Sequence, residues 1–133
     1  SLVVRQIEAE LIPAIEHFGL GLLPYFPLAS GLLTGKYQRA AALPAGTRLA
    51  KTERLQRRFL TDANWPRAER LAEFAAGRWH NLLELAFSWL LARPAIASVI
   101  AGATSPEQIE QNTTAGGWRL TPEDLAEIDR LCA

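Results

Sequence analysis

Two short apolar runs, separated by several helical patterns, constrain the fold of this chain more than any other feature. The runs LGLLPYF (20–26) and AIASVIAG (95–102) have the length of strands. Neither run alternates polar with apolar residues, which is typical of strands buried on both faces of a parallel sheet. Strands that alternate with helices predict parallel βαβ units, so we expect an α/β protein. Leu2–Val4 resembles the tail of a further strand.

Helices are predicted around these runs from apolar spacing and from start signals. Pro13 lies inside the first helical pattern and predicts a kink there. Ser105-Pro106 and Thr121-Pro122 each combine an N-cap residue with proline at the first helical position, and each predicts a capping box. The expected helices cover about residues 5–18, 53–60, 67–76, 81–92, 105–115 and 121–131.

The chain is expected to form one domain, 1–133, with a long loop at 29–66. That loop lacks strong periodicity, although we expect a short helix near 53–60 within it, and loops of this length are usually functional or disordered. A complete (β/α)8 barrel takes about 250 residues. A lone pair of parallel strands would leave two unpaired edges. We therefore expect a part of a larger domain, or a chain that associates.

Composition limits the kinds of partner. Lys+Arg and Asp+Glu both number 14, whereas a general nucleic-acid surface needs a basic excess. No apolar run approaches the roughly 18 residues of a membrane span, so neither a nucleic-acid nor a membrane partner is expected. The single cysteine, Cys132, favours a reducing, cytoplasmic setting. His17 and His80 lie far apart, and no metal site is expected.

The stretch PYFPLASGLLTGKYQ (24–38) partly matches a phosphate-binding P-loop. That motif needs G-x-x-x-x-G-K-[S/T]. Here Ser30 stands where the first glycine should be, and Tyr37 stands where a small hydroxyl should bind magnesium. A P-loop nucleotidase is therefore disfavoured.

A second stretch, SVIAGATSPEQIEQN (98–112), places a small-residue turn between a buried strand and a helix start. Free N–H groups at a helix start attract anions, and Gly102 would allow close approach of a ligand. The same residues also make an ordinary turn and helix cap. No Arg or Lys lies within 101–112, so a phosphate here would need cations from elsewhere.

Three motifs in order, YFPLASGLLTGKY, SVIAGATSPEQIEQN and GGWRLTPEDLAEID, resemble the C-terminal part of an aldo-keto reductase. The resemblance covers nearly the whole chain. It implies a partial (β/α)8 TIM barrel that supplies about strands 7 and 8, LLPYFPL and ASVIAG, with their flanking helices. It also implies NADP(H)-dependent reduction of small aldehydes and ketones, without metal.

The resemblance assigns cofactor-binding roles to residues of the first motif. Tyr25 would stack on the nicotinamide ring; the alternative is a plain strand-end aromatic in the core. Phe26 departs from the family, where a serine commonly follows the aromatic residue. Lys36 and Arg48 would supply cations near the phosphates, or would be solvated loop charges. The turn that passes the pyrophosphate would be Pro27, Leu28, Ala29 and Ser30.

The second motif matches positions around the adenosine and its 2′-phosphate. Many members of the family have Glu at the position of Gln111, and some have Arg at the position of Gln108. The two glutamines leave NAD(H) open beside NADP(H). The matching residues are Gly102, Thr104, Gln108, Gln111 and Asn112.

The resemblance assigns no catalytic residue to this chain. In the family an Asp, a Tyr, a Lys and a His come from earlier strands, and the tyrosine acts as general acid. A cofactor site without an acid to protonate the carbonyl oxygen leaves the main transition-state charge unstabilised, so we expect no reductase activity from this chain alone. The alternative is a non-catalytic half-barrel module that self-associates or binds a partner chain.

Overall fold

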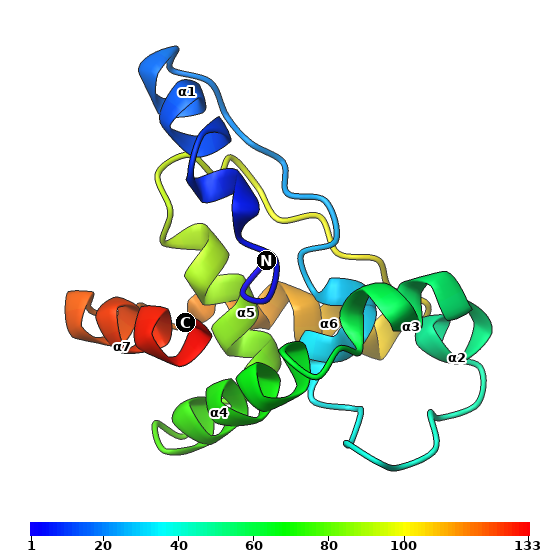
Figure 1. Cartoon of the computed structure of the whole chain (residues 1–133). Helices are drawn as coiled ribbons and strands as arrows, with labels where there is room; N and C mark the ends of the chain where they lie inside the picture. Colours follow the sequence, from blue (N-terminus) through cyan, green and yellow to red (C-terminus); the bar gives the residue numbers. More distant parts are fainter.

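A computed structural model describes residues 1–133, and regular structure in it is almost entirely helical (Figure 1). Helices α4, α5 and α7 form the helical body of the molecule, and α6 lies to the right of α5 in the view of Figure 1. The helices are α1 (Leu11–His17), α2 (Arg48–Lys51), α3 (Glu53–Phe59), α4 (Asn64–Ala76), α5 (Leu82–Leu91), α6 (Pro106–Thr114) and α7 (Pro122–Cys132), with 3-10 turns η1 (Gln6–Glu8), η2 (Ala29–Thr34) and η3 (Ala115–Gly117).

The two apolar runs expected to be strands lie side by side but pair at one point only. The Leu22 N–H donates to the Ala95 carbonyl at 2.7 Å, and the Ala97 N–H donates to the Leu22 carbonyl at 3.0 Å. These bonds make a single parallel bridge between Leu22 and Ile96. The prediction of neighbouring parallel segments is therefore confirmed, whereas the prediction of two regular strands is wrong for this chain.

The short ladder has a physical cause. Two parallel strands alone are marginal, because a sheet needs further strands or a packed face for stability. Here Leu23 and Ile100 are 55% and 64% exposed, so neither run is buried on both faces as its composition predicts. Leu2–Val4 is also not a strand. It forms a turn, closed by the Val4 N–H on the Ser1 carbonyl, and places Leu2 and Val3 in the core.

The first predicted helix, 5–18, divides into η1 and α1. Helix α1 begins at Leu11, so Pro13 occupies its first turn. An N–H there has no intrahelical partner, and proline costs little at that place. The predicted kink is therefore replaced by a helix that starts later.

The other predicted helices are confirmed, with differences at their starts. Helix α4 begins at Asn64, because the Thr61 hydroxyl accepts from the Asn64 N–H at 3.1 Å, and Pro66 is third in the helix instead of first. The expected loop at 29–66 contains α3 as predicted. It also contains η2 and α2, which periodicity did not indicate.

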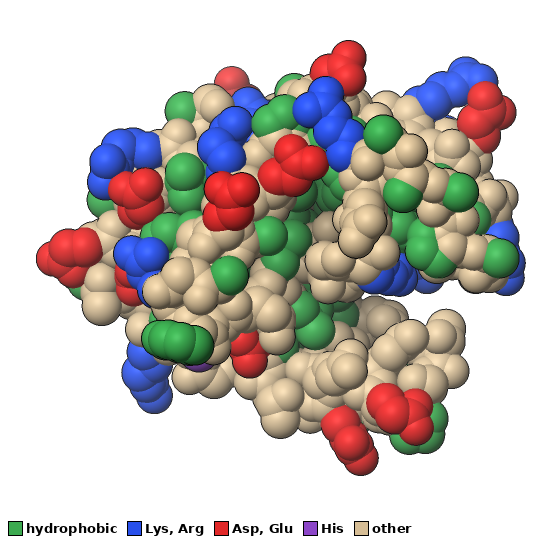
Figure 2. Space-filling view, turned by 90° about the horizontal axis from the view of Figure 1, so that it is seen from below, with side chains coloured by type: hydrophobic (Ala, Val, Ile, Leu, Met, Phe, Trp, Pro, Cys, Tyr) green, Lys and Arg blue, Asp and Glu red, His purple; other side chains and the backbone are tan.

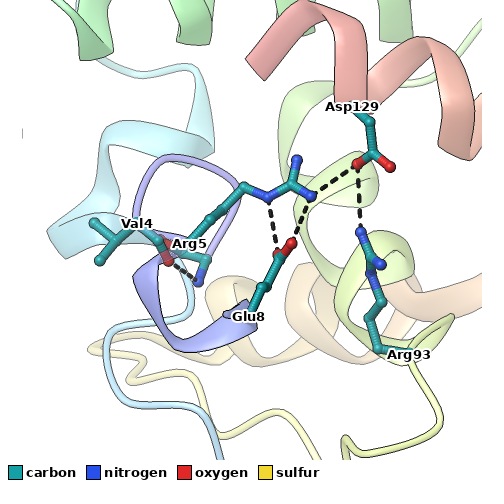
Figure 3. A network of polar contacts seen from close by, with 6 residues as sticks. Val4, Arg5, Glu8, Arg93 and Asp129 are labelled. Carbon is teal, nitrogen blue, oxygen red and sulfur yellow. Dashed lines mark hydrogen bonds and ion pairs between the residues drawn. The ribbon is translucent and has the colours of Figure 1, made fainter. Parts of the chain in front are cut away.

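The core is built by α4, α5 and α7 packed with η2 and α3. An ion-pair network closes one side of it (Figure 3). The Arg5 guanidinium lies 2.7 Å from Glu8 and 2.9 Å from Asp129, and Arg93 lies 3.4 Å from the same Asp129. Both guanidinium groups also lie over the ring of Trp89, at 5.2 and 4.6 Å. The network thus joins the N-terminal residues to α5 and α7. None of the helices is long and apolar enough to cross a bilayer.

Candidate nucleotide-binding site

The turn after the first apolar run has an unusual backbone. Phe26, Ala29 and Ser30 have φ values of 55°, 49° and 57°, a left-handed conformation that non-glycine residues rarely adopt. Ala29 and Ser30 are also buried. Such strained residues persist only where the surroundings hold them, and they concentrate at ligand-binding sites. The segment that the family resemblance places along the pyrophosphate is therefore a strained turn.

Some side chains of this turn pack against the core, and others are exposed. Phe26 packs edge-on against Phe59 with ring centroids 5.3 Å apart, and Pro27 is buried while Leu28 packs against the core. Tyr25 is 80% exposed, and its ring centroid lies 4.2 Å from that of the neighbouring Phe26 ring. The alternative of a core aromatic is thus wrong for Tyr25, whose ring faces are open to a flat ligand.

The Ser30 hydroxyl is buried in this turn without a hydrogen-bond partner. A buried polar group without a partner costs about 1–3 kcal/mol, so it marks a place where a ligand atom or a water is expected. This orphaned hydroxyl is an observation that fits a polar ligand along the turn.

Lys36 packs back on the same turn. A Cβ added at Gly31 would lie 2.9 Å from Lys36 Cε and 3.1 Å from its Nζ, and the φ of Gly31 is +98°. Glycine is therefore favoured here by the backbone conformation, while the flexible end of the lysine side chain could shift to admit a Cβ. Lys36 Nζ also lies 5.2 Å from the Tyr37 ring. No helix begins at Lys36, since the next helix starts at Arg48. A P-loop requires a helix there, so that interpretation fails.

The second motif begins α6 as predicted, but one hydrogen bond of the expected cap goes to a different residue. The Ser105 hydroxyl accepts from the Gln108 N–H at 3.4 Å. In a capping box the Gln108 side chain would return to the Ser105 N–H. Instead, its Oε1 accepts from the Thr104 N–H at 2.9 Å and from the Thr104 hydroxyl at 3.3 Å. The predicted capping box is therefore wrong at Ser105, whereas at Thr121 both bonds with Asp124 are present.

The long loop brings a cation to the second motif. Arg48 is the first residue of α2, and a Cβ added at Gly102 would lie 4.0 Å from its Nη2. The two residues are far apart in the sequence, and no Arg or Lys lies within 101–112 itself. The structure thus supplies at this turn the cation that the motif lacks.

A surface hollow of about 380 Å³ adjoins the second motif. It lies between α5, the segment 98–103 and α6, and its lining includes Leu91, Ile109 and Asn112. Gln108 and Gln111 do not line it, and both are exposed. Figure 2 shows a notch at the right-hand side of the molecule, where basic side chains face a lobe whose visible charges are acidic.

Sequence reasoning missed one cation beside the strained turn. The Arg58 guanidinium lies 5.5 Å from the Phe26 ring and 5.2 Å from the Phe59 ring. In the sequence it is one of several basic residues in the mixed-charge patch KTERLQRRF. Nothing in the spacing of that patch distinguishes it from the other basic residues. No group of three or more metal-ligating side chains is present.

Comparisons relate the whole chain to known proteins. The Aldo/keto reductase family matches residues 1–133. An L-glyceraldehyde 3-phosphate reductase from Escherichia coli O157:H7 is 35% identical over 128 residues, which cover 92% of this chain and 36% of that protein. A protein named probable voltage-gated potassium channel subunit beta, from Oryza sativa subsp. japonica, is 37% identical over 131 residues, which cover 96% and 40%.

A solved structure agrees with the sequence relatives. The glycerol dehydrogenase of Gluconobacter oxydans superposes with a TM-score of 0.77 at 25% identity, over 98% of this chain and 39% of that one. The chain therefore spans between 36% and 40% of the length of these three proteins.

Proposed function

The chain belongs to the aldo-keto reductase family, and we propose that it forms the C-terminal, cofactor-binding part of an oxidoreductase that reduces aldehydes and ketones to alcohols. The cofactor is a nicotinamide dinucleotide. The resemblance implies NADP(H), with NAD(H) as the alternative. The catalytic acid belongs to other strands of the barrel, and the single cysteine favours a cytoplasmic location.

One observation carries this proposal. Two motifs that are far apart in the sequence lie on adjacent parallel segments, joined through Leu22. Parallel strands of a barrel present the loops that follow them at one face. The strained turn at 26–31 and the turn at 101–104 follow these segments, and Arg48 lies beside Gly102. A cation, a strained turn and a helix start thus lie on one face, where a dinucleotide with its charged phosphates could bind.

Each group has a distinct proposed role. The open face of Tyr25 stacks on the nicotinamide, which leaves one face of the ring free for hydride transfer. The turn 27–30 passes the pyrophosphate, with Lys36 and Arg48 as its counter-charges. The segment 102–112 receives the adenosine. When bound, the dinucleotide supplies the hydride. The residues of this chain bind and orient it.

Titration with reduced dinucleotide tests this proposal. We expect saturable binding below about 1 mM, followed by nicotinamide fluorescence. Loss of one stacking interaction costs about 0.5–1.5 kcal/mol, so Tyr25→Ala is expected to weaken binding about two- to twelvefold. Phe18→Ala removes another exposed aromatic ring (71% exposed) and is expected to leave affinity unchanged. Absence of binding at millimolar cofactor would overturn the proposal that these residues hold the cofactor in this chain on its own, and would leave the family membership standing.

A second candidate, a self-associating module, is favoured by the apolar surface of the two segments. Leu20, Leu23 and Ile100 are 61%, 55% and 64% exposed, and each segment has an open edge. Sedimentation separates the two candidates. A species of twice 14.6 kDa that dissociates on Ile100→Asp would support the module, and a monomer over the whole micromolar range would reject it.

A further inference from the structure

A second hollow, of about 320 Å³, lies between the start of the long loop and helix α4, and we call it the α4 hollow. Gly35, Tyr37 and Arg39 line it from the loop, and Trp65 and Glu69 line it from α4. Its size falls at the lower end of the range of small-molecule pockets, about 300–1,000 Å³. It shares no lining residue with the hollow beside α6, and no residue assigned to the dinucleotide lines it. The α4 hollow is therefore a candidate site for a different, smaller ligand.

The floor of the α4 hollow is apolar and belongs to the core. Leu32, Ala68 and Leu82 line it and are 2%, 5% and 5% exposed. Trp65 and Tyr37 add aromatic surface beside this floor. Apolar and aromatic groups of a ligand pack favourably on such surface. The floor therefore favours a ligand with an apolar part.

The wall of the hollow also contains a polar group whose hydrogen bond is not made. Tyr37 is 7% exposed, and its buried hydroxyl has no hydrogen-bond partner within the chain. A tyrosine hydroxyl can both donate and accept, and a buried polar group without a partner marks a place where a ligand atom or a water is expected. This hydroxyl fits a ligand that carries polar groups as well as an apolar part.

Arg39 and Glu69 bring opposite charges to the same hollow. Both are exposed, and neither forms an ion pair within the chain, with the other or with a third residue. A guanidinium pairs with a carboxylate through two parallel hydrogen bonds, and a carboxylate accepts from an ammonium group. Both side chains are thus available to a ligand that itself carries one charge of each sign.

We propose that the α4 hollow binds a free α-amino acid with an apolar side chain. The carboxylate of the ligand pairs with Arg39, its ammonium group pairs with Glu69, and its side chain packs on Trp65 and the apolar floor. The residue at either end of a peptide keeps only one of these two charges, so the opposite charges select the free amino acid. A water molecule takes about 30 Å³ of the liquid, so the hollow holds roughly ten non-hydrogen atoms, as in leucine or phenylalanine.

Calorimetric titration of the chain with L-phenylalanine at neutral pH tests this proposal. We expect saturable binding with a Kd of about 1 mM or below, as is usual for a ligand of this size. Two analogues each lack one charge, since 3-phenylpropionate has no ammonium group and 2-phenylethylamine has no carboxylate. Each is expected to bind about tenfold more weakly, because one charge-assisted contact is lost.

Two results of these titrations would overturn the proposal. One is the absence of saturable binding of L-phenylalanine up to about 10 mM, tenfold above the highest expected Kd. The other is an analogue that binds as tightly as L-phenylalanine, which would show that the hollow does not recognise both charges. Neither result depends on dinucleotide binding, because the two sites share no assigned residue.

Variants that remove one charge test the two assigned contacts separately. Arg39→Gln is expected to weaken L-phenylalanine and 3-phenylpropionate about tenfold and to leave 2-phenylethylamine unchanged. Glu69→Gln is expected to weaken L-phenylalanine and 2-phenylethylamine by a similar factor and to leave 3-phenylpropionate unchanged. Arg119→Gln, the control, removes an exposed charge outside the hollow and should change no affinity. Equal weakening of all three ligands by either hollow variant, or weakening by the control, would overturn the assignment.

Discussion

The helical body (α4, α5 and α7) and the face that we propose binds the dinucleotide (the nucleotide face: 25–36, Arg48 and 98–112) are held together by different means. In the body, Leu71, Leu85 and Ile128 are fully buried, and complete capping boxes begin α5 and α7. In the nucleotide face, Tyr25 is 80% exposed, and residues 26, 29 and 30 are in left-handed conformation. The body is stabilised by burial, while the face carries strain and exposed groups that a ligand would satisfy.

Truncating a buried leucine of the body should produce the largest effect. Leu85 is 0% exposed in α5, and Leu→Ala changes in cores lower the free energy of unfolding by about 2–5 kcal/mol. Leu23→Ala, the matched change at a half-exposed position beside the nucleotide face, is expected to cost less than about 1 kcal/mol. Urea unfolding measures both. Equal losses would mean that the two regions are equally packed.

Removing the charge of Asp124 should have the next largest effect, and a pH-dependent one. Burial alone would raise the pKa of this carboxyl, but the Thr121 N–H and Arg78, 2.7 Å away, outweigh burial and lower the pKa from its ordinary value of 3.8. A lowered folded pKa gives stability that is present above the unfolded pKa and lost as pH falls through the folded one. Asp124→Asn is expected to cost about 1–2 kcal/mol at pH 6.

The pH profile distinguishes this charge effect from a packing effect. Unfolding free energies measured from pH 6 down to pH 3 should fall more steeply in the unmodified chain than in Asp124→Asn, and the two curves should approach each other at the acid end. Parallel curves over that range would show that the carboxylate charge contributes nothing.

The N-cap residues of α6 and α7, Ser105 and Thr121, allow a further comparison of the two regions. The Thr121 hydroxyl accepts from the Asp124 N–H at 3.1 Å within a complete capping box, so Thr121→Ala is expected to cost about 1 kcal/mol. Ser105 accepts one bond of 3.4 Å on an exposed helix, and Ser105→Ala is expected to cost less than about 0.5 kcal/mol. Thermal unfolding compares the two, and a larger loss at Ser105 would reverse the assignment of strong and weak helix starts.

The same contrast explains what could be predicted from the sequence. Helices α4 and α5 were predictable because their apolar patterns are local, and α6 and α7 because their proline and N-cap signals are local. The two strand-like runs reduce to one bridge at Leu22, because a parallel ladder depends on neighbours far along the chain. The family resemblance assigned the cofactor residues. It could not predict that the Gln108 side chain binds the Thr104 N–H instead of the Ser105 N–H, because residue type does not decide between two neighbouring N–H groups.

The strained turn was beyond prediction for another reason. Left-handed backbone is signalled by glycine or asparagine, and Phe26, Ala29 and Ser30 carry neither signal. Tertiary contacts hold them, such as Phe26 packed on Phe59. Their conformation therefore became visible only in three dimensions.

Ser30→Gly should give a small change in stability, with the opposite sign. Ser30 has φ 57° and a buried hydroxyl without a partner. Glycine adopts this φ without strain and removes the unpaired group, so the free energy of unfolding is expected to rise by about 0.4–1 kcal/mol. If the hydroxyl serves the dinucleotide, loss of one neutral hydrogen bond also weakens cofactor binding about two- to tenfold.

Ala40→Gly is the matched control, because Ala40 has φ 61° in the exposed part of the long loop. It should gain stability through the same relief of strain and leave dinucleotide affinity unchanged. Opposite changes in stability and binding at Ser30, but not at Ala40, would show that strain in the turn is retained for the ligand. A Ser30→Gly chain that is less stable, or that binds as well as before, would instead make the turn an ordinary part of the scaffold, since only a functional site gives up stability to keep a binding group in place.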